Sequence, residues 1–139
     1  MPARKTTPFF LNNNTLCTPH FLEPLISVLE RDPTCSPIGP TLLDPQDKTI
    51  QHVGVGITPF GNPIHLFESF PANHPIVRQP KKNPAVITGA ALLIRRNTFQ
   101  DYGGFFEDYQ NGFEYLALYA KMRRRGLSLS LESKSTMFH

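Results

Sequence analysis

The segment from Gly103 to Gly126 constrains the fold of this chain more than any other stretch. The diglycine at 103–104 favours a turn, and an acidic, aromatic loop then leads to Glu114. From about Phe113 to Arg125, apolar side chains recur at helical spacing, and basic residues gather where the helix dipole is negative. The pattern predicts a helix that glycine ends, with an acidic residue at its start, where any chemistry is expected. Its predicted buried stripe consists of Leu116, Tyr119, Ala120 and the stem of Arg123.

A short apolar run and a row of asparagines open the ordered part of the chain. Pro8–Leu11 is typical of a short buried strand, and Asn12–Thr15 of the turn at its carboxyl end, because asparagine tolerates left-handed backbone. Thr18 is expected to cap a helix whose first residue is Pro19 and which ends before Asp32-Pro33. Residues 8–34 therefore predict a strand, a turn and a helix.

Strands and helices alternate along the rest of the chain. Ser36–Leu43 predicts a strand that is irregular or at a sheet edge, because its prolines cannot donate ladder hydrogen bonds. Thr49–Ile57 is its expected hairpin partner, and residues 58–84 predict an irregular loop excursion. The remaining predicted elements are a strand over Val86–Ile94, a helical turn from an Asn97 cap to Tyr102, and a strand around Leu127–Leu131. This order predicts an α/β fold with a mixed sheet.

Composition narrows the class of protein. With 139 residues the chain fits one domain, and its net charge of +3 is too mild to indicate nucleic-acid binding by itself. Cys17 and Cys35 lack the spacing of a metal site and are expected to be free thiols. No apolar run is long enough to span a bilayer, and MPARKTT lacks the apolar centre of a signal peptide. We therefore expect a soluble, cytoplasmic protein.

The order of the motifs resembles the family 2 glycosyltransferases of GT-A fold, in particular bacterial rhamnosyltransferase-like members. From Pro8 onward nearly the whole chain takes part in the resemblance. The matching stretches are PFFLNNNTLCTPHFLEPLISVLERDP (metal-motif strand and helix), IGPTLLDPQDKTIQHVGV (hairpin), AVITGAALLIRRNTF (acceptor-side strand), GGFFEDYQNGFEYLALYAKMRRRGL (segment of the Glu-Asp motif) and STMFH (closing strand that ends in histidine).

The resemblance implies one partial GT-A domain over residues 1–139, with the metal-motif segment at 8–34 and the acceptor-side, base-bearing segment at 85–139. Most of the family's N-terminal Rossmann-like half, which grips the nucleotide, is expected to be missing. It also implies inverting transfer of a sugar from a nucleotide-diphosphate sugar to a saccharide or lipid-linked acceptor, assisted by Mg²⁺ or Mn²⁺. An uncovered sheet edge would favour a homo-oligomer or a partner chain.

The resemblance also assigns the candidate site residues. Asn12 and Asn14 stand where the family has its acidic metal and diphosphate motif, and His139 matches the terminal histidine that approaches the metal. Neutral amides supply none of the charge of a typical Mg²⁺ site, so metal affinity is expected to be weakened. Glu114 and Tyr115 match the Glu-Asp pair, and Tyr115 is a poor base because tyrosine is protonated at neutral pH.

Thr88 and Gly89 are further candidates for ligand binding, because a missing side chain there lets a ligand approach the predicted strand. Plainer interpretations stay open at each position. The asparagines are also typical of a simple turn, Glu114 of a first-turn acid, and His52, His65 and His74 of loop or core residues. The rival function is a non-catalytic binding or scaffold module that retains the fold, and a nucleic-acid role is a distant third.

Overall fold

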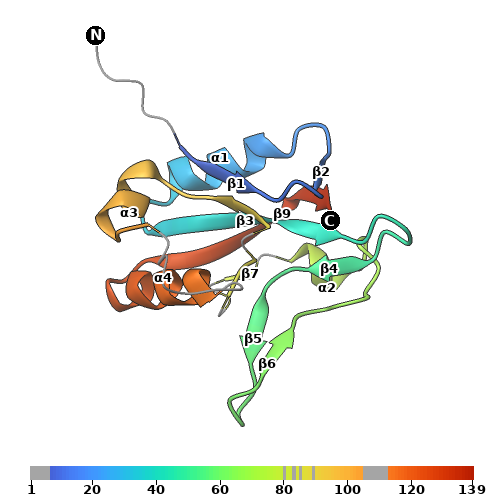
Figure 1. Ribbon diagram of the computed structural model, residues 1–139. Helices are drawn as coiled ribbons and strands as arrows, with labels where there is room; N and C mark the ends of the chain where they lie inside the picture. The colour runs from blue at the N-terminus through green and yellow to red at the C-terminus, as the bar shows by residue number, and fades with distance from the viewer. Residues whose placement is uncertain (1–6, 80, 83, 85, 89, 105–112) are drawn as a thin grey trace.

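A mixed sheet forms the centre of the protein, with α1 on one face and α4 on the other (Figure 1). The structure, a computed structural model, describes residues 7–79, 81–82, 84, 86–88, 90–104 and 113–139. The helices are α1 (Leu22–Arg31), α2 (Pro75–Arg78), α3 (Arg96–Asp101) and α4 (Phe113–Arg124). The strands are β1 (Phe9–Leu11), β2 (Leu16–Cys17), β3 (Cys35–Leu43), β4 (Ile50–His52), β5 (Val55–Ile57), β6 (Pro63–His65), β7 (Lys81–Lys82), β8 (Ala91–Leu93) and β9 (Ser128–Phe138).

The sheet has the order β1-β8-β3-β9-β2, with β4 added to β3 and β7 added to β9. β9 runs parallel to β3, whereas β8 is antiparallel to both β1 and β3. β1, β3 and β9 therefore point in the same direction, and their carboxyl ends lie on one side of the sheet. The expectation of an α/β fold with a mixed sheet and flanking helices is confirmed.

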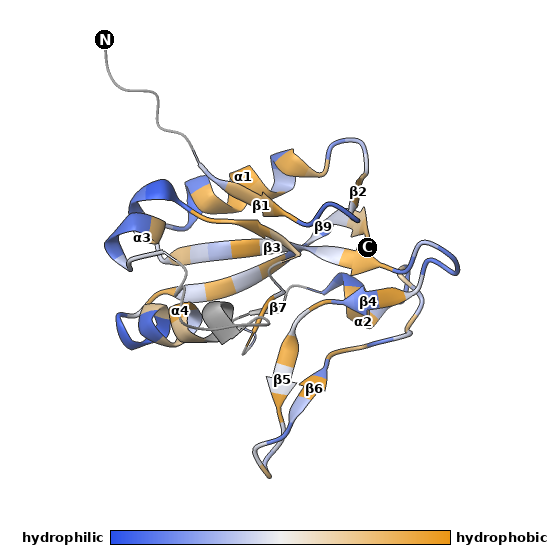
Figure 2. Ribbon diagram, viewed as in Figure 1, coloured by the Kyte–Doolittle hydropathy of each residue, from blue (hydrophilic) through white to orange (hydrophobic). Residues whose placement is uncertain are grey.

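Alternating side chains of β8 divide the core between the two faces of the sheet. Leu92 belongs to the cluster that contains Leu118 and Met122 of α4. Leu93 points the other way and belongs to the cluster that contains Leu25 and Leu29 of α1. Because successive residues of a strand face opposite sides, one short strand stabilises both layers. Figure 2 shows the hydrophobic stripes of the central strands between the helices.

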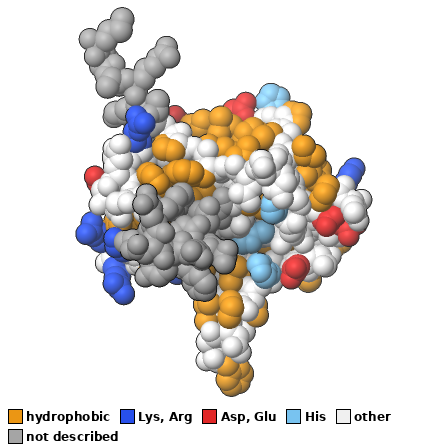
Figure 3. All heavy atoms as spheres, viewed as in Figure 1, with side chains coloured by type: hydrophobic (Ala, Val, Ile, Leu, Met, Phe, Trp, Pro, Cys, Tyr) orange, Lys and Arg blue, Asp and Glu red, His pale blue; other side chains and the backbone are white. Residues whose placement is uncertain are grey.

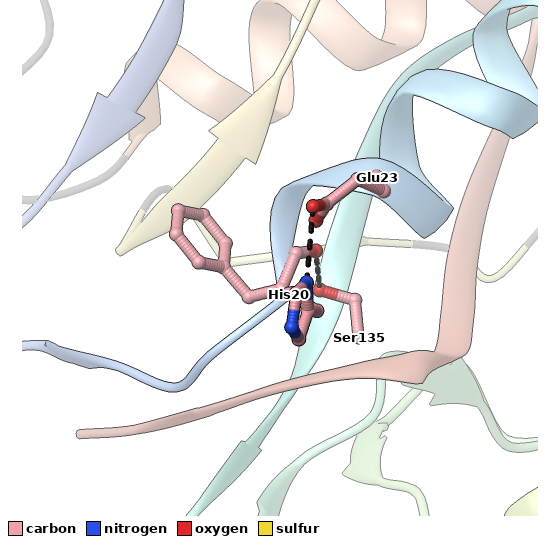
Figure 4. Close-up of polar contacts among 4 residues, drawn as sticks. His20, Glu23 and Ser135 are labelled. Atoms are coloured by element: carbon pink, nitrogen blue, oxygen red, sulfur yellow. Dashed lines mark hydrogen bonds and ion pairs between the residues drawn. The ribbon is translucent and has the colours of Figure 1, made fainter.

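Helix α1 begins later than the sequence predicts, and the prediction that Thr18 caps the helix is wrong. Phe21 is the residue before the first turn, and no side chain caps the helix. Thr18 Oγ1 instead donates to the carbonyl of Thr136 over 2.6 Å, and Ser135 Oγ donates to that of Phe21 over 2.5 Å. Figure 4 shows this second contact beside the 3.2 Å pair of His20 and Glu23. Contacts with β9 therefore fix the start of the helix.

The prediction that Ser36–Leu43 is irregular or at an edge is wrong about its place. β3 lies between β8 and β9 and is buried along its whole length. The prolines are tolerated because the β3–β9 register shifts between Cys35 and Ile38 and again after Pro40. The missing donors thus fall where the regular ladder is already interrupted.

The hairpin partner of β3 is confirmed in part. β4 pairs with the end of β3, but the chain then turns away, and β5 pairs with β6 in a separate two-stranded sheet. This second hairpin projects from the body of the protein (Figure 1). The region at 58–84, predicted as an irregular loop excursion, contains β6, α2 and β7.

Three boundaries in the second half differ from prediction. The strand predicted over Val86–Ile94 is limited to Ala91–Leu93, with Val86 forming an isolated bridge to Val55. Asn97 lies inside α3, and Arg95 stands at the capping position without a side-chain cap. The strand predicted near Leu127–Leu131 extends to Phe138, because β3 pairs again with Thr136–Phe138 after a register shift and β2 pairs with Met137 and Phe138.

The predicted helix over Phe113–Arg125 is confirmed as α4, which ends one residue earlier. Gly126 follows it with a φ of +83°, the left-handed conformation that ends many helices. Both cysteines are free thiols, as expected. Within the described ranges, no helix is long and apolar enough to cross a membrane. β1 and β2 end the sheet order, and association of copies through such an edge stays a prediction.

Candidate functional site

The carboxyl ends of β1, β3 and β9 bring several predicted site residues to one side of the sheet. Asn12 follows β1, Asp44 follows β3, and His139 follows β9. β8 runs the opposite way, so its amino end, preceded by Thr88 and Ala90, lies at the same side. In α/β sheets, ligands bind outside the carboxyl ends of the strands. We refer to this side, with Asn12–Thr15, Thr88, His52 and His139, as the candidate edge.

The asparagine run forms an exposed turn on the candidate edge. The backbone N–H of Asn12 donates to the carbonyl of Ala90 over 2.8 Å, and that of Thr15 donates to the carbonyl of Asn12 over 3.2 Å. These bonds fix the backbone of the turn, and the side chains of Asn12, Asn13 and Asn14 are exposed. Three neutral amides, each able to donate and to accept hydrogen bonds, therefore face outward.

Thr88 is held against the core histidine of the candidate edge. Its backbone N–H donates to Nε2 of His52 over 3.0 Å, and its Oγ1 accepts the N–H of Ala90 over 3.2 Å. His52 is buried, and burial lowers its pKa to about 4, with the neighbouring His65 and His139 adding to the effect. A neutral His52 with its proton on Nδ1 fits the bond from Thr88. Sequence reasoning treated His52 as a loop or core residue, and the structure confirms the core position.

His139 is fixed by Gln51, which sequence reasoning missed. Gln51 Nε2 donates to the carbonyl oxygen of His139 over 2.7 Å. Gln51 Oε1 also lies 2.7 Å from His139 Nδ1. The backbone N–H of His139 donates to the carbonyl of Leu43 over 3.0 Å. Because an amide oxygen only accepts, Nδ1 of His139 carries the proton and its Nε2 holds the lone pair when the ring is neutral.

A buried hydroxyl adjoins His139. Leu16 pairs with Phe138, so Thr15 and His139 are neighbours at the end of that ladder. Thr15 is buried, and its Oγ1 has no hydrogen-bond partner among the residues that the structure describes. Such a hydroxyl costs free energy unless something completes its hydrogen bonding. A threonine in a polar turn gives no indication in the sequence that its hydroxyl is buried without a partner.

The donors of the candidate edge are a poor fit for a hard divalent cation. Mg²⁺ and Mn²⁺ sites depend on carboxylates, whereas Asn12, Asn14 and a neutral His139 bring no negative charge. In the part of the chain that the structure describes, no group of three or more His, Cys, Asp or Glu residues could hold a metal ion. The nearby Asp44 accepts the N–H of Gln46 over 2.8 Å in a turn. Metal binding stays a prediction.

The side chains of the predicted base residues are outside the part of the chain that the structure describes. Glu114 and Tyr115 belong to the first turn of α4, but their side chains lie outside the described residues, as does all of Gly89. The helix itself is anchored by Leu118, Tyr119 and Met122, which are buried against the sheet. The roles of Glu114, Tyr115 and Gly89 stay predictions.

Comparison with known proteins gives one relative and no family. No model of a known protein family matches the chain. The chain is 30% identical over 135 residues to the O-antigen biosynthesis protein RfbC of Myxococcus xanthus. The aligned stretch covers 94% of this chain and 10% of that protein. The chain thus spans about a tenth of the length of the curated relative that it matches.

Proposed function

We propose that this chain is part of a protein of polysaccharide biosynthesis, and that it is a partial glycosyltransferase domain of family 2 with the GT-A fold. The ordered motifs, the mixed α/β sheet and the similarity to an O-antigen biosynthesis protein support the proposal. The proposed reaction transfers a sugar, with inversion, from a nucleotide-diphosphate sugar to a saccharide or lipid-linked acceptor.

The observation that carries the proposal is that Asn12–Asn14, Thr88 and His139 lie on one side of the sheet. Asn12 follows β1, His139 follows β9, and Thr88 precedes the antiparallel β8. The asparagine amides and Nε2 of His139 supply hydrogen-bonding groups for hydroxyls or phosphate oxygens of a sugar nucleotide. The turn backbone is held by one bond from Asn12 to Ala90 and one from Thr15 to Asn12, and Gln51 holds His139, so both groups are oriented before a ligand binds.

The proposed activity of the chain alone is low. A glycosyl transfer needs a general base that is ionised at neutral pH, and Tyr115 occupies the position of the family's base. Glu114 is the proposed substitute, as the neighbouring acid in the same helical turn. Metal assistance is proposed to be weak, because the donors at the candidate edge are neutral.

Ligand binding at the candidate edge is tested by saturation-transfer NMR with a panel of nucleotide-diphosphate sugars and with their sugars alone. We expect weak binding that Asn14→Ala reduces, whereas Asn73→Ala, an exposed asparagine beside α2, leaves it unchanged. The same panel with Mn²⁺ and acceptors should give little turnover. Robust turnover would contradict the proposed impairment, and equal binding by both variants would contradict the proposed site.

The second candidate is a non-catalytic binding or scaffold module. The neutral asparagines in place of an acidic motif favour it, because they retain hydrogen bonding and lose the charge that metal-assisted transfer needs. Asn14→Asp combined with Tyr115→Asp, assayed with a nucleotide-binding half supplied, separates the two. A gain of activity supports a degraded enzyme, and no gain supports the scaffold.

A further inference from the structure

The β5–β6 hairpin is the most protruding part of the molecule. Val55 pairs with His65 and Ile57 with Pro63, and the strands extend away from the main sheet (Figure 1). At the base of the hairpin, the N–H of Val55 donates to the carbonyl of Val86 over 3.0 Å, and the N–H of Leu66 donates to the carbonyl of Gly54 over 3.0 Å. The hairpin is therefore fixed to the body of the protein at its base and free of it at its tip.

The tip of the hairpin is apolar and uncharged. Phe60 is 91% exposed, Ile57 is 55% exposed, and Ile64 is 47% exposed. No Lys, Arg, Asp or Glu occurs between Lys48 and Glu68. Figure 3 shows the hydrophobic side chains along the projecting hairpin and at its end. Leaving a phenylalanine this exposed is costly in water, so the tip is suited to an apolar environment.

The tip is also preformed. The N–H of Gly61 donates to the carbonyl of Thr58 over 2.9 Å, and the N–H of Asn62 donates to Thr58 Oγ1 over 3.1 Å. The N–H of Thr58 closes the turn by donating to the carbonyl of Asn62 over 2.9 Å. These bonds satisfy turn groups that would otherwise need water, so the turn can leave water without losing all of its hydrogen bonds.

The size of the apolar tip favours a lipid surface over a protein. Stable protein interfaces bury about 800 Å² of surface on each partner. Three apolar side chains that are only partly exposed can bury roughly a few hundred Å² at most. A small apolar wedge binds membranes weakly by itself and needs a second attraction, commonly positive charge against anionic lipid. The net charge of the chain is +3, and the hairpin itself carries no Lys, Arg, Asp or Glu, so the attraction acts between anionic lipid and the chain as a whole.

We propose that the β5–β6 hairpin is a membrane-contact element, which inserts Phe60, Ile57 and Ile64 into the interface of an anionic lipid bilayer. Attachment is peripheral and reversible, and it falls as salt screens the attraction between the positive chain and the lipid. The proposal does not rest on the proposed sugar transfer, because the three inserted residues, Ile57, Phe60 and Ile64, do not belong to the candidate edge, although His65 of β6 lies beside His52.

The test uses the absence of tryptophan from the chain. Phe60→Trp makes a protein with a single fluorescent reporter at the tip, and Ile26→Trp, on the exposed face of α1, is the matched control. Vesicles of phosphatidylcholine with phosphatidylglycerol should shift the Phe60→Trp emission to the blue, and brominated acyl chains should quench it. The control should show neither effect.

Cosedimentation with the same vesicles gives the energetic readout. Phe60→Asp should weaken partition by roughly tenfold to a hundredfold, from the loss of one buried aromatic ring. Circular dichroism checks that this variant folds, and the tryptophan variant keeps the proposal testable if it does not. Emission unchanged by vesicles would overturn the proposal. A blue shift that follows protein concentration without lipid would also overturn it, since a second copy would then cover the tip.

Discussion

The backbone N–H of Thr88 donates to Nε2 of His52 over 3.0 Å, which joins the start of the acceptor-side segment to the end of β4. The bond needs an unprotonated Nε2, and burial holds the pKa of His52 down at about 4. The pH of the solution should therefore act directly on the stability of the candidate edge.

We expect acid to destabilise the fold through His52. The pKa of His52 is about 4 in the folded protein, below its ordinary value of 6.5, so the unfolded chain takes up the proton first as pH falls. The contribution is complete above pH 6.5 and is lost between 6.5 and about 4, to a total of about 3 kcal/mol. Urea unfolding across this range measures it. His52→Gln should flatten the pH dependence, and the exposed His20→Gln should not; parallel curves for all three proteins would contradict the assignment.

Arg95 should be a major contributor to stability. Its guanidinium donates to the carbonyls of Leu29, Asp32 and Cys35, with distances of 2.8 Å to Asp32 and 2.6 Å to Cys35. It therefore binds the carboxyl end of α1 to the start of β3. Arg95→Ala should lower the free energy of unfolding by about 2–3 kcal/mol, because the partly buried carbonyls of Leu29 and Cys35 lose a charged donor.

Arg96 provides the matched control for Arg95. It is exposed at the start of α3, so Arg96→Ala should change the free energy of unfolding by no more than about 0.5 kcal/mol. Arg95→Lys should fall between the two, because an ammonium lacks the fork that reaches several carbonyls. Chemical denaturation ranks the three variants. Equal stability of the Arg95→Ala and Arg96→Ala proteins would show that the carbonyl contacts contribute nothing.

Two glycines with positive φ should respond differently to alanine. Gly54 has a φ of +109°, and a Cβ there would lie 2.9 Å from Leu131 Cδ1 and 3.0 Å from Pro84 Cβ. Gly61 has a φ of +86°, with nothing within 4 Å of its added Cβ. Gly61→Ala should cost about 1 kcal/mol from backbone strain, and Gly54→Ala about 2–4 kcal/mol, because overpacking adds to the strain. Thermal unfolding compares them, and equal costs would contradict the packing at the root of the hairpin.

Restoring charge at the asparagine turn should restore metal affinity. Asn12→Asp with Asn14→Asp adds two carboxylates at exposed positions whose backbone is already fixed. Mn²⁺ affinity, followed by titration calorimetry or electron paramagnetic resonance, should rise by roughly tenfold or more, since hard cations prefer charged oxygen ligands. Asn73→Asp adds a carboxylate elsewhere and should leave the affinity unchanged. Equally weak Mn²⁺ binding by the unchanged protein, the double variant and the Asn73→Asp variant would contradict the proposed metal site.

Local patterns in the sequence predicted most elements of the fold. Pro8–Leu11, the helix through Leu29 and the helix at 113–124 follow from apolar spacing and from their flanking turn residues. The errors arise from long-range pairing. Prolines 37 and 40 indicate an edge strand when taken alone, but the register shifts against β9 admit them in the centre of the sheet.

The candidate edge was predictable only in part. Asn12, Asn14 and His139 could be chosen from the order of the motifs, and Thr88 from the glycine beside it; the structure brings the backbones of these four residues to one side of the sheet. Gln51 could not, because its role depends on a contact with a residue 88 positions away. Pairing of this kind leaves no local periodicity, so only the folded chain reveals it.

The pairing of β3 with β9 has a consequence for how the protein is made. β3 ends at Leu43 and β9 begins only at Ser128, so a ribosome releases β3 long before its main partner exists. Until then, an apolar strand with open hydrogen-bonding edges waits in the growing chain, exposed to aggregation and to chaperones. The central sheet can therefore be completed only after β9 has left the exit tunnel.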